Sequence, residues 1–194
     1  MKNSPAFLPA LSANFLMRYS YASPSMSLGT NVAERFYVGL SSGKPTLPLR
    51  TGGSQPSLHN FSASKDQWAY IGRYLENNPR KQIGVFLPNY RLANELQDFV
   101  EKMPHLKSQI YRNEFGKEND VDPCRPGLLI TYLDNAKGLE FDAVFIPSLE
   151  KWHHQIDFET KMKLYVLSSR SRQDLHFSWV GLGEPSVLGV FPRD

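Results

Sequence analysis

The chain has 194 residues, of which 41% are hydrophobic and 12% aromatic, enough for one domain with a real core and too much for a disordered chain. Its 22 basic and 19 acidic side chains are mostly interspersed, so the formal net charge of +3 permits nucleic-acid binding without arguing for it. One cysteine excludes an intramolecular disulfide, and no apolar run approaches the roughly 20 residues of a membrane span, so we expect a cytoplasmic protein with no membrane partner.

The first 60 residues predict an irregular arm or connecting segment. They are rich in Ser, Pro, Gly and Asn and show little sustained periodicity, apart from a short helical pattern over residues 31–38. Residues 45–57 predict extended chain and turns, because proline restricts φ and the pair Gly52-Gly53 favours a loop. We therefore place the start of the regular domain at residue 61, so that it covers residues 61–194.

Helical and strand patterns alternate from residue 61 onward. Ser64 and Gln67 form a capping-box signature at the start of the first helix, which Asn78-Pro79 ends. A second helix surrounds residues 92–100 and a third covers 157–172; strands are predicted over 83–87, 109–112, 127–132, 143–146 and 175–180. The three tryptophans are expected in the core: Trp68, Trp152 and Trp179. Such alternation predicts an α/β fold, a parallel sheet with helices on both faces.

The loop over residues 134–140 is the first candidate for chemistry. It follows the predicted strand 127–132, and in an open parallel sheet ligands bind beyond the carboxyl ends of the strands. Gly138 would let the backbone approach a ligand, while Lys137 and Glu140 bracket it with opposite charges. For a lone Lys-Gly pair, a turn with solvated side chains would be the simpler interpretation.

Two segments carry a resemblance to a known family. Residues 137–146, KGLEFDAVFI, closely resemble motif V of the UvrD/Rep-type superfamily 1 DNA helicases, written KGLEFD-x-VF. Residues 164–172, LYVLSSRSR, are similar to motif VI, commonly LLYVALTRA. Weaker resemblances, at residues 81–100 and 20–31, extend the match to roughly residues 16–194. The resemblance implies the C-terminal motor domain of such a helicase, with a RecA-like, P-loop NTPase-like fold.

The resemblance assigns roles to individual residues. Arg170 aligns with the motif VI arginine, which crosses the domain interface to the γ-phosphate of ATP, a role that suits a permanently charged planar fork. Glu140 takes the place of the glutamate near the nucleotide ribose, and Gly138 belongs to the same cofactor-binding loop. Three candidate nucleic-acid contacts follow from the same alignment: Asp134, Lys137 and Ser169. The alternative for Arg170 is a surface residue near a helix end, where the dipole favours cations.

Several residues depart from the family pattern. Ala22 stands where motif IV has an arginine that also reaches the γ-phosphate, so residues 1–60 contain a degenerate motif IV. Asp134 stands where motif V has a DNA-contacting histidine, and a carboxylate there would repel a phosphodiester by on the order of 1 kcal/mol or more. Tyr132 and Ser169 replace two threonines. The changes at Ala22 and Asp134 suggest a weakened grip on DNA or weakened hydrolysis.

The phosphate-binding half of a motor is missing from the sequence. There is no G-x-x-x-x-G-K-[ST] loop and no acidic strand end for Mg²⁺; the near miss at residues 39–45, GLSSGKP, has Pro45 where Ser or Thr must bind the metal. We therefore expect ATP and Mg²⁺ only with a complementary N-terminal motor domain, and no hydrolysis by the chain alone. His153-His154 with Asp157 and Glu159 does not predict a metal site, because adjacent side chains diverge.

Three functions remain open at this point. In the first, the chain completes an ATP site with an N-terminal motor domain or subunit and couples it to translocation on single-stranded DNA. In the second, it is a non-catalytic helicase-like module that binds a protein partner or nucleic acid, which Ala22 and Asp134 favour and Arg170 opposes. The third, a free-standing α/β enzyme with an unrelated pocket, has only the fold in its favour.

Overall fold

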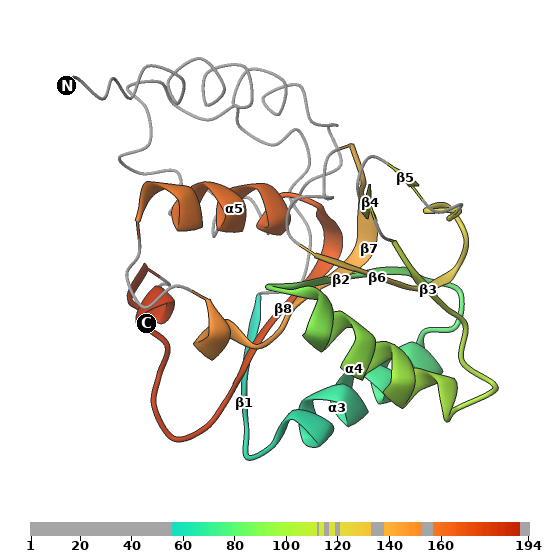
Figure 1. The fold of residues 1–194 in the computed structure, drawn as a ribbon, viewed down its shortest axis with the longest axis horizontal. Coiled ribbons are helices and arrows are strands. Elements are labelled where there is room, and N and C mark those ends of the chain that lie inside the picture. The colour runs from blue at the N-terminus through green and yellow to red at the C-terminus, as the bar shows by residue number, and fades with distance from the viewer. Residues whose placement is uncertain are drawn as a thin grey trace.

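A parallel β-sheet organises the molecule. The computed structural model describes residues 56–111, 113–114, 117–118, 121–132, 138–152 and 157–190. Six strands pair in the order β1-β8-β7-β2-β6-β3, every neighbouring pair parallel (Figure 1). They are β1 (Ser57–Phe61), β2 (Gln82–Leu87), β3 (Ser108–Ile110), β6 (Gly127–Tyr132), β7 (Phe141–Ile146) and β8 (Ser171–Val180). A separate antiparallel pair joins β4 (Asn113–Glu114) to β5 (Lys117–Glu118).

Helices cover both faces of the sheet. The first two, α3 (Ser64–Asn77) and α4 (Tyr90–Glu101), lie on one face, and α5 (Phe158–Ser168) lies on the other (Figure 1). Two short 3₁₀ helices, η2 (Leu149–Lys151) and η3 (Ser186–Val190), follow β7 and β8. The predicted parallel α/β fold with helices on both faces is confirmed. None of the helices in the described ranges is long and apolar enough to cross a membrane.

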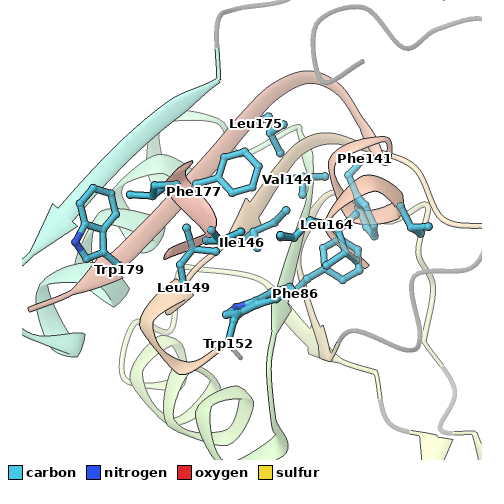
Figure 2. Close-up of a cluster of buried hydrophobic side chains, with 14 of the residues drawn as sticks. Phe86, Phe141, Val144, Ile146, Leu149, Trp152, Leu164, Leu175, Phe177 and Trp179 are labelled. Carbon is cyan, nitrogen blue, oxygen red and sulfur yellow. The ribbon is translucent and has the colours of Figure 1, made fainter. Parts of the chain in front are cut away.

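The alternation of side chains along the strands divides the core into two clusters. On the α3 and α4 side, the apolar faces of the two helices meet one set of strand residues, and Trp68 lies in this cluster. On the α5 side, Phe86, Phe141 and Phe177 pack with residues of α5, and Trp152 and Trp179 join them (Figure 2). The three tryptophans are between 4% and 9% exposed, so the expectation that they belong to the core is confirmed.

The strand β1 was not predicted, because its five residues fall almost wholly in the segment expected to be irregular. It pairs with β8 from Ser57↔His176 to Phe61↔Val180, so the sheet begins at residue 57. Its half-buried face carries a serine and a histidine beside one phenylalanine, which leaves little hydrophobic alternation to detect. The rest of the predicted arm, residues 1–55, lies outside the described residues, and with it Ala22 and the near-miss loop 39–45.

The ends of α5 and β8 also differ from the prediction. The helix ends at Ser168 rather than at residue 172, and β8 begins at Ser171 rather than at residue 175. Two residues, Ser169 and Arg170, therefore connect them. The helical pattern continues into a polar stretch whose strand character comes from pairing with β7, which local sequence does not encode.

Gln67 joins α3 to the carboxyl ends of β7 and β8. The predicted capping box is wrong: Ala63 is the N-cap and makes no side-chain bond. Gln67 instead points inward, where its Nε2 donates to Ser148 Oγ at 3.0 Å and its Oε1 accepts from Ser148 N–H at 3.2 Å and from Ser178 Oγ at 2.9 Å. Ser148 has a φ of 58°, a left-handed conformation rare outside glycine. The glutamine therefore fixes the turn that follows β7.

Replacing Gln67 with leucine should destabilise the chain strongly. All three residues of the network are buried, so Gln67→Leu leaves Ser148 N–H and two serine hydroxyls without their partner. We expect a loss of about 2–4 kcal/mol in the free energy of unfolding, measured by urea denaturation. The matched control is Gln97→Leu, whose side chain makes an exposed bond to Glu101. Equal stability of the two variants would contradict the role of Gln67.

Candidate functional site

The amino ends of β7 and β8 bring the two motif segments together. Phe141 N–H donates to the Arg170 carbonyl oxygen at 2.9 Å, and Arg170 Nη1 donates to the Leu139 carbonyl oxygen at 3.4 Å, across 31 positions of sequence. Gly138 and Glu140 flank Leu139. We call Gly138, Glu140, Arg170 and Arg172 the amino-edge site.

This location corrects one expectation. The loop over residues 134–140 was expected beyond the carboxyl ends of the strands. Its described part, Gly138 to Glu140, leads directly into Phe141, the first residue of β7, and so lies at the amino edge of the sheet. The reason is topological: β6 and β7 are both parallel to β2, so the chain must return to the opposite edge before β7 can begin.

Arg170 is 3% exposed and its guanidinium faces protein atoms. Nε donates to the Val166 carbonyl oxygen at 3.1 Å and Nη2 donates to Ser169 Oγ at 3.0 Å, in addition to the bond to Leu139. Val166 belongs to the last turn of α5, where carbonyl groups have no helical partner and the helix dipole attracts cations. The alternative interpretation of Arg170 as a surface residue is therefore wrong, although its position at a helix end is as expected.

Gly138 and Glu140 differ in exposure. Gly138 has a φ of 77°, which favours glycine, and a side chain there would meet no atom within 4 Å. The backbone at Gly138 is thus exposed to a ligand on its open side. The Glu140 side chain is only 16% exposed and lies beside Arg172, whose Nε is 3.5 Å from Glu140 Oε2.

Arg172, the second residue of β8, was not singled out in the sequence. Its Nη1 donates to Gln82 Oε1 at 3.3 Å and lies 3.6 Å from Asp142 Oδ1. Gln82 N–H in turn donates to Asp142 Oδ2 at 2.9 Å. The only signal for Arg172 was its place two residues after Arg170, because its neighbours depend on the register of three strands.

The remaining candidate residues divide into those that the structure describes and those that it does not. Ser169, expected as a nucleic-acid contact, is 4% exposed and donates to the Val166 carbonyl oxygen at 2.7 Å. Asp134, Lys137 and His153-His154 lie outside the described residues. Asp157 caps α5 by accepting from Thr160 N–H at 2.8 Å, and Glu159 pairs with Lys163 at 2.7 Å. No group of three His, Cys, Asp or Glu side chains within the described ranges could hold a metal ion.

A second polar cluster lies between β1, β8 and α3. The Tyr70 hydroxyl is 2.9 Å from His59 Nε2 and 3.1 Å from His176 Nδ1, and Ser57 Oγ is 2.6 Å from the same Nδ1. The His176 ring stacks on Phe145 with centroids 4.3 Å apart. Burial lowers the pKa of His176 to about 4, against the opposing charge of Asp174, and burial also lowers the pKa of His59. Both imidazoles are therefore neutral at physiological pH.

This cluster is structural in its geometry. Ser57 and Tyr70 share one ring nitrogen of His176, and the other, Nε2, is buried with no hydrogen-bond partner, so no acid orients the ring as a serine hydrolase requires. Beside it, the Tyr74 hydroxyl donates to Asp174 Oδ2 at 2.5 Å and Lys81 pairs with that oxygen at 2.6 Å. Burial, followed by the bond to Asp174, raises the pKa of Tyr74. These contacts tie β1 and α3 to β8.

A pocket of about 210 Å³ opens near the amino end of β6. It is lined by Leu75, Glu76, Pro79, His105, Leu106, Lys107 and Gly127. Glu76 and His105 pair at 2.8 Å with side chains 41% and 62% exposed, so water surrounds much of both groups. The pocket gives the free-standing enzyme hypothesis little support.

Comparison with solved structures shows the fold. The C-terminal domain of a possible DNA helicase from Lactobacillus plantarum WCFS1 is similar, with a TM-score of 0.56 and 20% identity over 82% of this chain and 90% of that one. An arterivirus nonstructural protein 10 helicase bound to DNA scores 0.45 at 9% identity, covering 68% of this chain and 31% of that one. The UvsW helicase from bacteriophage T4 scores 0.42 at 14% identity, covering 63% and 46%. The last two scores are too low to carry an argument.

No protein-family model matches the sequence, and no curated protein sequence matches it either. The first structural similarity covers most of both chains, so the described sheet shares the RecA-like fold of that domain. The predicted fold class is confirmed.

Removing the Arg170 side chain should destabilise the isolated chain. Arg170→Ala leaves the Val166 and Leu139 carbonyl groups and Ser169 Oγ without the guanidinium. We expect the free energy of unfolding to fall by about 2–4 kcal/mol in urea titrations. Arg73→Ala, at an exposed position of α3, is the control and should change stability by less than about 0.5 kcal/mol. Equal effects would show that the inward contacts contribute nothing.

Acidification should weaken the fold through His176. Its folded-state pKa of about 4 lies below the unfolded value of 6.5, so the unfolded chain takes up the proton first and stability falls as the pH drops between these values. The full loss in the free energy of unfolding that corresponds to this pKa difference is about 3 kcal/mol and is reached below pH 4. The stability of wild type relative to His176→Gln should therefore decline by this amount from neutral pH to pH 4. A His176 midpoint near 6.5 in NMR titrations of the folded chain would contradict this.

Proposed function

We propose that the chain is the C-terminal motor domain of a UvrD-like superfamily 1 DNA helicase, which completes an ATP site together with an N-terminal motor domain. The observation that carries the proposal is the contact between the two motif segments at the amino-edge site. Sequence resemblance alone gives two separate matches. Their meeting at one edge, through the Phe141–Arg170 and Arg170–Leu139 hydrogen bonds, supports a shared role.

The chemistry of the residues fits the part assigned to each. Arg170 has a permanent charge and a planar fork that complement phosphate oxygens, and such a cation stabilises the charge that develops on a transferred phosphoryl group. Glu140 accepts hydrogen bonds, which suits a ribose hydroxyl. ATP would supply the phosphates, whereas the phosphate loop and the Mg²⁺ ligands must come from the N-terminal domain, because this sequence contains neither.

Arg170 must exchange partners to act in this way. Its guanidinium now bonds to two carbonyl oxygens and a hydroxyl. The present acceptors are neutral, whereas a phosphate oxygen carries a negative charge that adds direct attraction to the guanidinium, so a docked ATP can compete with these contacts. Arrival of the N-terminal domain with its nucleotide would then turn Arg170 outward.

The connection from β6 to β7 supplies the route to DNA in this proposal. β6 ends with Tyr132 at the carboxyl edge of the sheet, and β7 begins with Phe141 at the amino edge, so the connection joins the two edges in sequence. Asp134 and Lys137 lie along it and are the candidate DNA contacts. A change at the nucleotide end of such a segment reaches the strand-binding end through covalent connection alone.

A non-catalytic helicase-like module is the second candidate. The observation in its favour is that Arg170 already has buried partners within its own domain. Ala22 and Asp134 point the same way, since each replaces a ligand-contacting residue of the family. Such a module would bind a protein or single-stranded nucleic acid without turnover.

The proposal predicts activity only in the reconstituted motor. The chain alone should show no ATP hydrolysis with single-stranded DNA, whereas the chain with its N-terminal motor domain should turn over. Arg170→Ala should lower kcat about a thousandfold or more, the usual effect of losing such an arginine. Arg73→Ala is the control, and circular dichroism confirms that each variant is folded. Turnover by the chain alone, or full activity of Arg170→Ala, would overturn the proposal.

Salt titration separates the second candidate from the first. If the motor shows no hydrolysis but the chain binds single-stranded DNA with an affinity that falls as salt rises, the module hypothesis gains support. Absence of binding at low salt would direct attention to protein partners.

A further inference from the structure

Arg172 lies between acceptors from three segments at the amino edge of the sheet. Its guanidinium is 3.5 Å from Glu140 Oε2, 3.6 Å from Asp142 Oδ1 and 3.3 Å from Gln82 Oε1. Glu140 precedes β7, Asp142 lies within β7, and Gln82 opens the central strand β2. One side chain of β8 therefore bridges to both β7 and β2.

These distances indicate that Arg172 makes several long contacts and no single strong hydrogen bond. Tight charge-assisted bonds of arginine measure about 2.7–2.9 Å, and all three contacts of Arg172 are longer. The Arg172 side chain is 37% exposed, so water screens the pairs and they add little to stability. What the arrangement does provide is orientation, because a planar fork fixed at several points restricts the groups around it.

The central strand in turn orients Arg172. Gln82 N–H donates to Asp142 Oδ2 at 2.9 Å, which holds the Asp142 carboxylate at the start of β2. Gln82 Oε1 accepts from Arg172 on the same side. Glu140 is the one member of this group that precedes its strand, so strand pairing does not hold its backbone as it holds the others, and Arg172 contacts its carboxylate directly.

Between the sugar and the phosphates of a nucleotide, the sugar is the part that Glu140 can bind. A carboxylate accepts hydrogen bonds from hydroxyl groups, whereas it repels phosphate oxygens. Because Glu140 is 16% exposed, only part of its carboxylate is accessible, and the rotamer decides which oxygen faces outward. A fixed rotamer is therefore a condition for a directed bond to a ribose hydroxyl.

We propose that Arg172 is the positioning residue of Glu140: it holds the carboxylate in the orientation that accepts from the ribose hydroxyls, and so sets the preference for nucleotides that carry them. The inference rests on the proposed function. Arg172 itself touches no nucleotide and acts through Glu140 alone.

The first test uses the isolated chain and requires no nucleotide. Glutamate labelled with ¹³C at Cδ reports on the Glu140 carboxylate, whose NMR signal is assigned with Glu140→Gln. Arg172→Ala should move this signal toward those of exposed glutamates, and Arg172→Lys should move it less. Arg73→Ala is the matched control, an exposed arginine on α3. An unchanged Glu140 signal in Arg172→Ala would overturn the inference whatever the function of the chain.

The second test uses the motor formed with the N-terminal domain. Arg172→Ala should raise KM for ATP about tenfold, the effect of one lost hydrogen bond, while kcat changes less than about twofold. The same variant should lose the preference for ATP over 2′,3′-dideoxyATP. Arg172→Lys should restore part of the affinity for ATP and part of this preference. The double variant Glu140→Gln, Arg172→Ala should behave like Glu140→Gln alone, because the two act in one path.

The outcomes distinguish the inference from the proposed function. If Glu140→Gln raises KM and removes the sugar preference but Arg172→Ala does neither, the positioning role is wrong and the proposed function stands. If Glu140→Gln itself has no effect, the ribose role of Glu140 fails, and the inference fails with it. A loss of stability in Arg172→Ala without a change in KM or sugar preference would likewise overturn the positioning role.

Discussion

The hydrogen bond from Phe141 N–H to the Arg170 carbonyl oxygen fixes the relation between the two motif segments. It aligns the first residue of β7 with the start of β8, and the pairing of Phe141 with Ser171 continues it. The Phe141 ring then packs against Phe86 and fills the space beside Gly84, where a Cβ would come within 2.6 Å of the ring. The segment to which the resemblance assigns ligand contacts thus also contains the residue that anchors its own strand, so part of its sequence pattern is explained by packing.

The parts of the fold that local sequence encodes were predictable, and those that depend on register were not. The apolar face of α3 and the strand β6 follow from periodicity and from a short apolar run. β1 was not predicted because its pairing with β8 spans more than 100 positions of sequence and its half-buried face is partly polar. Gln67 matched a capping pattern, yet its partners Ser148 and Ser178 are neighbours only in the folded sheet. At the site, resemblance selected Glu140 and Arg170, whereas Arg172 required the order of β2, β7 and β8.

The contacts by which Arg170 stabilises the fold compete with the contact to a ligand that its proposed function requires. Its contacts with Val166 and Leu139 join the end of α5 to the segment before β7, and the bond to Val166 satisfies a carbonyl group in the last turn of the helix. Any ligand that draws the guanidinium outward must replace these bonds, so the domain is more stable with the arginine inward. The free energy of binding must then offset the free energy lost with the inward bonds. This arrangement disfavours an outward arginine in the absence of a partner, which is consistent with a residue that acts only across an interface.

The strand β7 is held at both ends, and this bears on how a signal could cross the domain. At its amino end Asp142 bonds to Gln82 N–H, and at its carboxyl end Ser148 is fixed by Gln67 in a left-handed turn. Between these points Val144 and Phe145 are buried on opposite faces of the sheet. A strand so enclosed cannot shift alone, since packed interiors transmit displacement instead of absorbing it. A displacement of β7 must therefore involve the sheet as a whole.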